Sequence, residues 1–193
     1  SVWTTYVFTE LTLALGTLTS DLPYDVFVYD SSGTPTLESL AWTNATTRAT
    51  ALVLQNGVYV KTGATTRRYL GTFYTTSTTA TEDSYAKRFV WNNYNRRPRP
   101  MRILEATNSW TYTTATIRQA NGAVGNQLDF VRGLDEDAVT AQVVTAASNT
   151  SVGVDIAAPI GLDSTTTMAT GCVASWAQTQ VTGVPTPVGS TLQ

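Results

Sequence analysis

A cluster of arginines is the part of this sequence best suited to binding an anionic group. Six of the chain's twelve Lys and Arg residues fall within residues 87–102, with two aromatic residues among them. Guanidinium groups beside aromatic rings can bind phosphate or stack on nucleobases. They can equally pair with carboxylates, within the chain or across a subunit interface, where Arg, Trp and Tyr are enriched. The residues are Lys87, Arg88, Trp91, Tyr94, Arg96, Arg97, Arg99 and Arg102.

The charge of the whole chain favours carboxylates as the partners of this cluster. The formal net charge is −2 at pH 7, so the chain lacks the positive charge that drives binding to nucleic acid. We therefore expect no nucleic-acid partner. The charge balance leaves a small anionic ligand open as a weaker alternative.

Acidic residues offer two further kinds of chemistry. Asp135, Glu136 and Asp137 are consecutive, and three carboxylates in one loop can hold Ca²⁺ through oxygen ligands, although EF-hand spacing is absent. Asp155 and Asp163 are separate candidates without further support. Hydrolysis of a glycoside needs two carboxylates about 5–10 Å apart, and among fourteen acidic residues the sequence singles out no pair. We therefore predict no metal site, no cofactor and no catalytic residue.

The residues that are rare or missing exclude whole classes of site. The sequence contains no histidine and a single cysteine, Cys172. Histidine-based triads, zinc sites built from several cysteines and intrachain disulfides are therefore impossible in this chain. No apolar run reaches the roughly 18 residues of a membrane helix, so we expect no membrane partner. Five Trp and nine Tyr residues are expected mainly in the core, whereas exposed rings would indicate a carbohydrate site.

Composition and periodicity indicate strands. Threonine accounts for 37 of the 193 residues, and this β-branched residue favours strands over helices. Residues 24–30 and 34–43 flank a turn at 31–33, which predicts a hairpin. Asn56-Gly57 separates residues 51–55 from residues 58–61 and predicts a second hairpin with a type I′ turn.

The rest of the chain predicts more short strands and one exception. Glu82-Asp83-Ser84 could cap a short helix near 84–91, which Pro98 and Pro100 would not allow to continue. We predict an all-β fold of about ten short antiparallel strands, arranged as a β-sandwich or jelly roll, in a single domain over residues 1–193 with a weak subdivision near 75–81. The further strands are expected at 65–76, 101–106, 110–119, 127–132, 138–147, 152–157 and 171–181.

Several blocks of the sequence resemble a module that recurs in surface proteins of tailed-bacteriophage virions, of the tail-fibre, spike or capsid-decoration type. The resemblance covers roughly residues 9–167, and the order of the blocks is distinctive. The blocks are residues 24–30 (YDVFVYD), 37–44 (LESLAWTN), 48–61 (RATALVLQNGVYVK), 63–72 (GATTRRYLGT), 81–100 (TEDSYAKRFVWNNYNRRPRP), 109–121 (SWTYTTATIRQAN) and 161–166 (GLDSTT).

The resemblance implies a non-enzymatic structural protein on the virion surface, a tail fibre or a capsid-decoration or head-fibre protein. It implies a homotrimer that also contacts other virion proteins of the capsid or tail, and host-surface glycan is a further expected partner. A carbohydrate-binding module and a polysaccharide-degrading tailspike are the alternatives. Part of the expected upstream segment is missing, so the chain is expected to be the ordered part or a fragment of a longer protein. The expected subunit or capsid contact comprises Arg88, Trp91, Tyr94, Arg96, Arg97, Arg99 and Arg102.

Overall fold

The computed structural model describes residues 4–114, 116–136, 138–145, 154–170, 175–178 and 188–191. Contacts within the chain divide it into two compact units. The first contains Ser1–Ile103 and Leu128–Glu136, and the second contains Leu104–Gln127 and Asp137–Gln193. Residues 75–81, where the sequence suggested a weak subdivision, lie inside the first unit.

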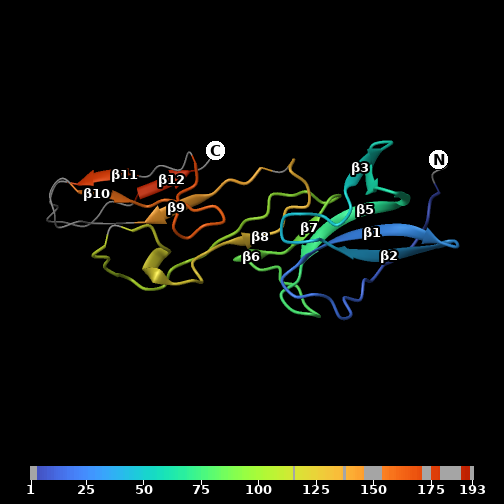
Figure 1. The fold of residues 1–193 in the computed structure, drawn as a ribbon, viewed down its shortest axis with the longest axis horizontal. Coiled ribbons are helices and arrows are strands. Elements are labelled where there is room, and N and C mark those ends of the chain that lie inside the picture. Colours follow the sequence, from blue (N-terminus) through green and yellow to red (C-terminus); the bar gives the residue numbers. More distant parts are fainter. Residues whose placement is uncertain are drawn as a thin grey trace. The chain divides into compact units, whose positions relative to one another are not determined.

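A six-stranded sheet forms the body of the first unit (Figure 1). Its strands lie in the order β2-β1-β5-β4-β3, and β7 pairs with β5 beside that path. A short parallel pair of β6 and β8 accompanies the sheet. The strands are β1 (Pro23–Ser31), β2 (Thr34–Ala41), β3 (Leu52–Gln55), β4 (Val58–Lys61), β5 (Ala64–Tyr74), β6 (Lys87–Arg88), β7 (Val90–Asn92) and β8 (Asp129–Phe130).

Both predicted hairpins are confirmed. Ser32 and Gly33 join β1 to β2 with φ of 53° and 89°, and Asn56 and Gly57 join β3 to β4 with φ of 51° and 82°. Positive φ at both central positions is the mark of a type I′ turn, whose twist matches that of the strands it connects.

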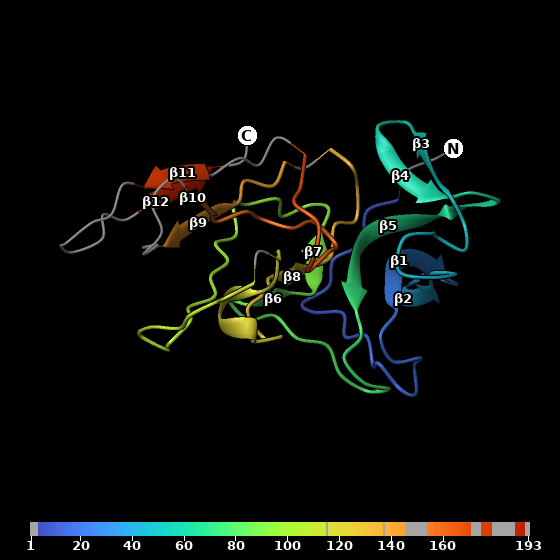
Figure 2. The same ribbon diagram turned by 60° about the vertical axis from the view of Figure 1, so that its left-hand side comes forward.

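The longest strand, β5, has partners on both sides. It pairs with β1 on one side, and on the other its first half pairs with β4 and its second half with β7. Figure 2 shows β5 as a strongly curved strand, in agreement with register shifts between Val26 and Phe27 and between Val60 and Lys61, since bulges bend strands. Gly71 allows β7 to approach closely, because a Cβ there would lie 2.2 Å from the carbonyl oxygen of Trp91.

Aromatic side chains make the core of the sheet. Phe27 and Tyr69 are fully buried, with ring centroids 5.9 Å apart. Tyr24 and Phe73 are buried across the same pair of strands and stack at 5.5 Å. Stacked and tilted ring pairs of this kind add to the free energy gained from burial alone.

Short strands form the second unit as the structure describes it. β9 (Gln142–Thr145) pairs with β12 (Val188–Thr191), and β10 (Val154–Ala157) pairs with β11 (Ser175–Gln178), both antiparallel. A single 3₁₀ turn, η1, spans Ala120–Gly122. The strands expected at 101–106 and 110–119 are wrong for the described residues, which are irregular there.

Local side-chain hydrogen bonds explain this irregular stretch. The Glu105 carboxylate accepts a hydrogen bond from the Thr107 backbone N–H at 2.8 Å. The Tyr112 hydroxyl donates to the Gln119 carbonyl at 2.8 Å. Side-chain groups that bond nearby backbone in this way compete with strand ladders.

The helix predicted near 84–91 is wrong. Ser84 and Lys87 close one turn, with the Ser84 N–H donating to the Lys87 carbonyl at 2.7 Å and the Ser84 hydroxyl accepting from the Lys87 N–H at 3.1 Å. Beyond that turn the backbone pairs with distant segments, since the Phe89 carbonyl accepts from the Tyr74 N–H at 2.8 Å. The run Phe89-Val90-Trp91 suits a strand better than a helix, because β-branched and aromatic residues pack well on a sheet.

The all-β class is confirmed. The strands of the described residues form one six-stranded sheet and three two-stranded sheets, of which only β6–β8 is parallel. The sandwich or jelly-roll arrangement stays a prediction. Among the described residues, no helix is long and apolar enough to cross a membrane.

Candidate functional site

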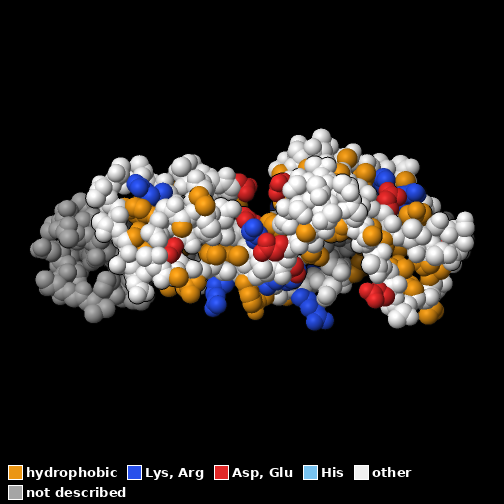
Figure 3. Space-filling model, turned by 90° about the horizontal axis from the view of Figure 1, so that it is seen from below, with side chains coloured by type: hydrophobic (Ala, Val, Ile, Leu, Met, Phe, Trp, Pro, Cys, Tyr) orange, Lys and Arg blue, Asp and Glu red, His pale blue; other side chains and the backbone are white. Residues whose placement is uncertain are grey.

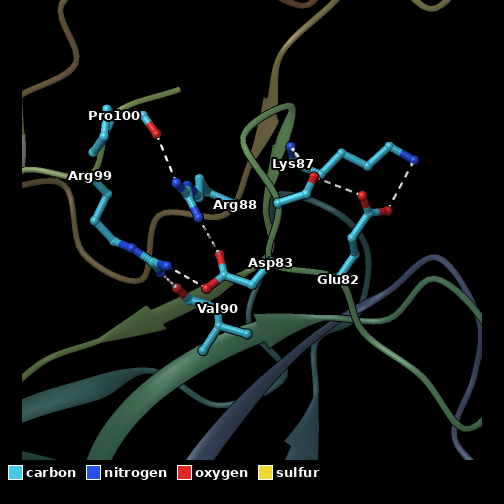
Figure 4. Close-up of polar contacts among 8 residues, drawn as sticks. Glu82, Asp83, Lys87, Arg88, Val90, Arg99 and Pro100 are labelled. Carbon is cyan, nitrogen blue, oxygen red and sulfur yellow. Dashed lines mark hydrogen bonds and ion pairs between the residues drawn. The ribbon is translucent and has the colours of Figure 1, made fainter. Parts of the chain in front are cut away.

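Two arginines of the predicted contact share one carboxylate inside the first unit (Figure 4). Arg88 lies 3.5 Å from Asp83 through Nη1, and Arg99 pairs with the other oxygen of the same carboxylate. Arg88 also donates to the Pro100 carbonyl at 2.9 Å, and Arg99 donates to the Val90 carbonyl at 2.9 Å. These bonds fix the extended segment after β7 against the turn that precedes β6.

A third arginine of the cluster joins this segment to the acidic turn. Arg96 donates to Glu136 Oε2 at 2.6 Å and to Asn93 Oδ1 at 2.7 Å, while its guanidinium lies 5.1 Å from the Trp91 ring centre. The Tyr59 hydroxyl donates to the other Glu136 oxygen at 2.6 Å. The Tyr59 hydrogen bond, followed by that of Arg96, lowers the pKa of the Glu136 carboxyl, and the same Tyr59–Glu136 bond raises the pKa of Tyr59.

The acidic turn therefore serves ion pairing in the described residues. Asp135 is bonded to Arg132 at 3.0 Å, and Asp137 lies outside the described residues. Asp155 is described in its backbone alone, as part of β10. Across the described part of the chain, no group of three or more His, Cys, Asp or Glu residues is placed to hold a metal ion.

Two arginines of the cluster differ from the others. Arg97 and Arg102 are exposed, and within the described residues neither guanidinium has a hydrogen bond or an ion pair. Their backbone N–H groups are bonded, to the Asn95 carbonyl at 3.1 Å and to the Tyr85 carbonyl at 2.9 Å. The backbone is thus held while the charged ends face solvent.

The two aromatic residues of the predicted contact differ in their exposure to solvent. Trp91 is half-buried and stacks on Tyr69 at 6.1 Å, so it belongs to the packing of the sheet. Tyr94 is 48% exposed, and its hydroxyl accepts a hydrogen bond from Arg68 Nε at 2.7 Å. The Arg68 guanidinium lies over the Tyr94 ring, 4.5 Å from its centre, and makes no ion pair with a described carboxylate.

The surface reflects this division of charge. On the face drawn in Figure 3, some Lys and Arg side chains lie beside acidic side chains, and others project away from any acidic group. Of the predicted contact residues, Arg88, Arg96, Arg99 and Trp91 are held by interactions inside the first unit. Tyr94, Arg97 and Arg102 present exposed surface.

Sequence reasoning missed a buried polar network on the sheet. Asp25 is 1% exposed and accepts hydrogen bonds from Arg48 Nε at 2.8 Å and from the Thr72 hydroxyl at 2.7 Å. The Tyr69 hydroxyl lies 2.6 Å from that of Thr72, and burial raises the pKa of Tyr69. Arg48 also donates to the Gly133 carbonyl. No local pattern marks this network, because the partners of Arg48 lie 21 to 85 positions from it along the chain.

A surface hollow lies next to this network. Its volume is about 400 Å³, and its walls come from the loop after β2, the β3–β4 hairpin and the loop after β8. The lining residues are Thr46, Thr47, Arg48, Ala51, Leu52, Tyr59 and Leu134.

No protein-family model, curated protein or solved structure matches this chain. What the chain does must therefore be inferred from its own residues. The two features that stand out are the unpaired arginines at 97 and 102 and the hollow beside Arg48.

Proposed function

We propose that this chain is a non-enzymatic structural protein on the surface of a tailed-phage particle, a tail fibre or a capsid-decoration or head-fibre protein that assembles as a homotrimer. The observation that carries the proposal is the pair of exposed guanidiniums on Arg97 and Arg102, which find no partner among the described residues. The resemblance of the sequence blocks to virion surface proteins supports the location on a phage particle.

The surroundings of Arg97 and Arg102 favour a protein partner. The segment is held rigidly by Arg96, which reaches Glu136, and by Arg99, which reaches Asp83. Tyr94 adds an exposed aromatic ring to the same segment. A backbone that is already held suits an interface, because less conformational entropy is lost on binding. Each guanidinium can in addition hold a carboxylate through two hydrogen bonds.

A second copy of the chain can supply the carboxylates. In the described part of the first unit, Glu10, Asp21 and Asp30 form no ion pair with a Lys or Arg, although Asp30 accepts a hydrogen bond from the Gly33 N–H at 2.6 Å. In a ring of three subunits, each interface joins two different faces of the same chain. The first unit thus carries exposed arginines and carboxylates without ion pairs in the described residues, and an interface between two copies could pair them.

The mass of the purified chain in solution tests the assembly. Light scattering should give a value near three times 20.8 kDa. The double variant Arg97→Glu/Arg102→Glu should dissociate, and the variant Arg118→Glu/Arg132→Glu, with the same change in net charge, should remain a trimer. A monomeric wild-type chain would overturn the homotrimer, and a trimer that survives Arg97→Glu/Arg102→Glu would overturn the assignment of the contact.

Immunogold labelling of phage particles whose genome encodes this sequence tests the location. An antibody to the chain should label the outside of intact particles. Labelling confined to disrupted particles, or to host cell material, would contradict a place on the virion surface.

A polysaccharide-degrading tailspike is less well supported. Its chemistry needs two carboxylates that face a substrate. Among the described residues, six carboxylates of the first unit are instead held by cations. These are Asp25 with Arg48, Glu38 with Lys61 and Arg67, Glu82 with Lys87, Asp83 with Arg88 and Arg99, Asp135 with Arg132, and Glu136 with Arg96. The carbohydrate-binding alternative has one observation in its favour, the hollow beside Arg48.

A further inference from the structure

We propose that the hollow beside Arg48 and Tyr59 binds a neutral saccharide. The proposal rests on the proposed function only for the source of the sugar, a glycan of the host surface. Its chemistry follows from the walls of the hollow.

The lining combines apolar and hydroxyl groups. Ala51, Leu52 and Leu134 provide aliphatic surface, and Tyr59 provides a half-buried aromatic ring. Thr46 and Thr47 provide exposed hydroxyls. A pyranose ring has the same division, with a face of C–H groups and a rim of hydroxyls. A volume of about 400 Å³ falls within the range of small-molecule sites.

Arg48, which lines the hollow, and Glu136, which accepts a hydrogen bond from Tyr59, are both already in ion pairs. Arg48 is paired with Asp25 at 2.8 Å, and its Nη2 donates to the Gly133 carbonyl. Glu136, which accepts from the Tyr59 hydroxyl, is paired with Arg96 at 2.6 Å. An anionic ligand would have to compete with these partners for its cation. A neutral ligand needs only hydrogen bonds and apolar contact.

Hydrogen-bonding capacity remains at the rim. The Thr47 hydroxyl has no hydrogen-bond partner among the described residues. The Thr46 hydroxyl donates to Asn44 Oδ1 at 3.1 Å and can still accept. The Tyr59 hydroxyl donates to Glu136 and can accept as well. These groups can therefore bond the hydroxyls of a sugar without breaking the existing network.

The walls are fixed before any ligand arrives. The loop after β2 is closed by a hydrogen bond from the Thr43 N–H to the Thr47 carbonyl at 2.8 Å, and Asn44 Oδ1 accepts from the Thr46 N–H at 2.9 Å. The Thr62 N–H donates to the Ala51 carbonyl at 3.0 Å and ties the loop to the end of β4. Preorganised walls reduce the entropy lost on binding.

Saturation-transfer NMR with the full chain tests the site. The probes are methyl glycosides of glucose, galactose and mannose, with sialic acid as the anionic counterpart. At least one neutral glycoside should show saturation transfer and should bind more tightly than sialic acid. Binding of no neutral glycoside, or preferential binding of sialic acid, would overturn the proposal.

Two variants place the binding in the hollow. Thr47→Val keeps the shape of an exposed side chain that has no partner, and it should weaken binding about three- to tenfold through loss of one hydroxyl contact. Tyr59→Ala should weaken it at least about tenfold, since the ring and the hydroxyl are both lost. Tyr112→Ala, which removes a ring that is 41% exposed and lies outside both the hollow and the proposed subunit contact, should leave binding unchanged.

The outcomes separate this site from the proposed assembly. Full binding by both Thr47→Val and Tyr59→Ala would place the sugar elsewhere and overturn the site. A trimer that binds no glycoside would overturn only the site. A monomer that binds a neutral glycoside through Thr47 and Tyr59 would overturn only the homotrimer.

Discussion

Arg48 reaches from the loop after β2 to the buried carboxylate of Asp25, with Nε donating to Oδ2 at 2.8 Å. The Arg48 side chain is 20% exposed and that of Asp25 only 2%. Arg48 also lies over the Trp42 ring, 4.4 Å from its centre. One side chain thus neutralises a charge inside the sheet, covers an aromatic residue and forms part of the wall of the hollow.

The first prediction concerns the loss of this pair. Arg48→Met leaves Asp25 buried without a cation, and removal of one partner of a buried pair costs about 3–5 kcal/mol. Because Arg48 is partly exposed, we expect the free energy of unfolding in urea to fall by about 3 kcal/mol. Arg132→Met is the control, since its pair with the fully exposed Asp135 should contribute under about 1 kcal/mol. Equal losses in the two variants would refute the role given to Asp25.

The second prediction concerns acid stability and Glu38. Burial favours a raised pKa for this carboxyl, but the hydrogen bonds and charges of Lys61 and Arg67 together lower it below its ordinary value of 4.5. The unfolded chain therefore takes up this proton at a higher pH than the folded chain, and acid favours unfolding. The stability from Glu38 should be complete at neutral pH, begin to fall near pH 4.5 and be lost once the pH passes below the depressed pKa.

Urea unfolding at several values between pH 7 and pH 2 measures this contribution. Glu38→Gln should be less stable than the wild type at pH 7, and the two stability curves should converge in acid. Glu10→Gln, at an exposed position without an ion pair in the described residues, should follow the wild-type curve. If the stability curves of the wild type and Glu38→Gln stayed parallel across this pH range, the ion pairs of Glu38 would make no contribution to the pH dependence of stability.

The third prediction concerns the approach of β7 to β5. A methyl group at position 71 would lie 2.2 Å from the Trp91 carbonyl oxygen, a backbone atom that cannot move without opening the pairing. Gly71→Ala should lower the free energy of unfolding by about 2–3 kcal/mol, at the upper end of overpacking effects. Gly125→Ala, where nothing lies within 4 Å of the new Cβ, should change it little. If Gly71→Ala left the free energy of unfolding unchanged, β7 would be held less tightly than its register indicates.

The fourth prediction concerns Glu105 in the second unit. A hydrogen bond from Asn126 is the main cause that lowers the pKa of Glu105 to about 2, followed by bonds from Thr107. NMR titration of the Glu105 side-chain carboxyl carbon should give a midpoint near that value. Asn126→Ala should raise the midpoint toward the ordinary value of 4.5. An unchanged midpoint in Asn126→Ala would show that Thr107 alone holds the carboxylate.

The strands that the sequence predicts well are those whose signal is local. The turn at 31–33 and the Asn56-Gly57 turn each lie between alternating runs, and both hairpins are found. Their strands need only the adjacent segment as a partner, so periodicity and turn chemistry suffice.

The helix expected near 84–91 shows where local signals fail. Glu82, Asp83 and Ser84 have the residue types of a helix cap, but Ser84 closes a single turn. Asp83 instead holds Arg88 and Arg99, the second of which is 16 positions away. Pairing with β5 then determines the conformation of the residues that follow, and this long-range contact is invisible in the local pattern.

The candidate site could be predicted only in part. The cluster at 87–102 is conspicuous in sequence, yet its division into paired and unpaired arginines depends on carboxylates as distant as Glu136, which is 40 positions from Arg96. The hollow could not be predicted at all, because its walls come from three separate segments. The proposals on assembly and on saccharide binding each draw on contacts of this long-range kind.

The first unit is built from two separate stretches of the chain, with part of the second unit between them. Residues 104–127 belong to the second unit, and Leu128–Glu136 belong again to the first. During synthesis on a ribosome, Arg48 therefore cannot bond the Gly133 carbonyl until that residue has been made. The bonds from Tyr59 and Arg96 to Glu136 are delayed in the same way. The amino-terminal sheet can complete its polar contacts only once these residues have emerged. No single cut would separate the two units, so a fragment ending at Ile103 would lack the groups that anchor its own loops.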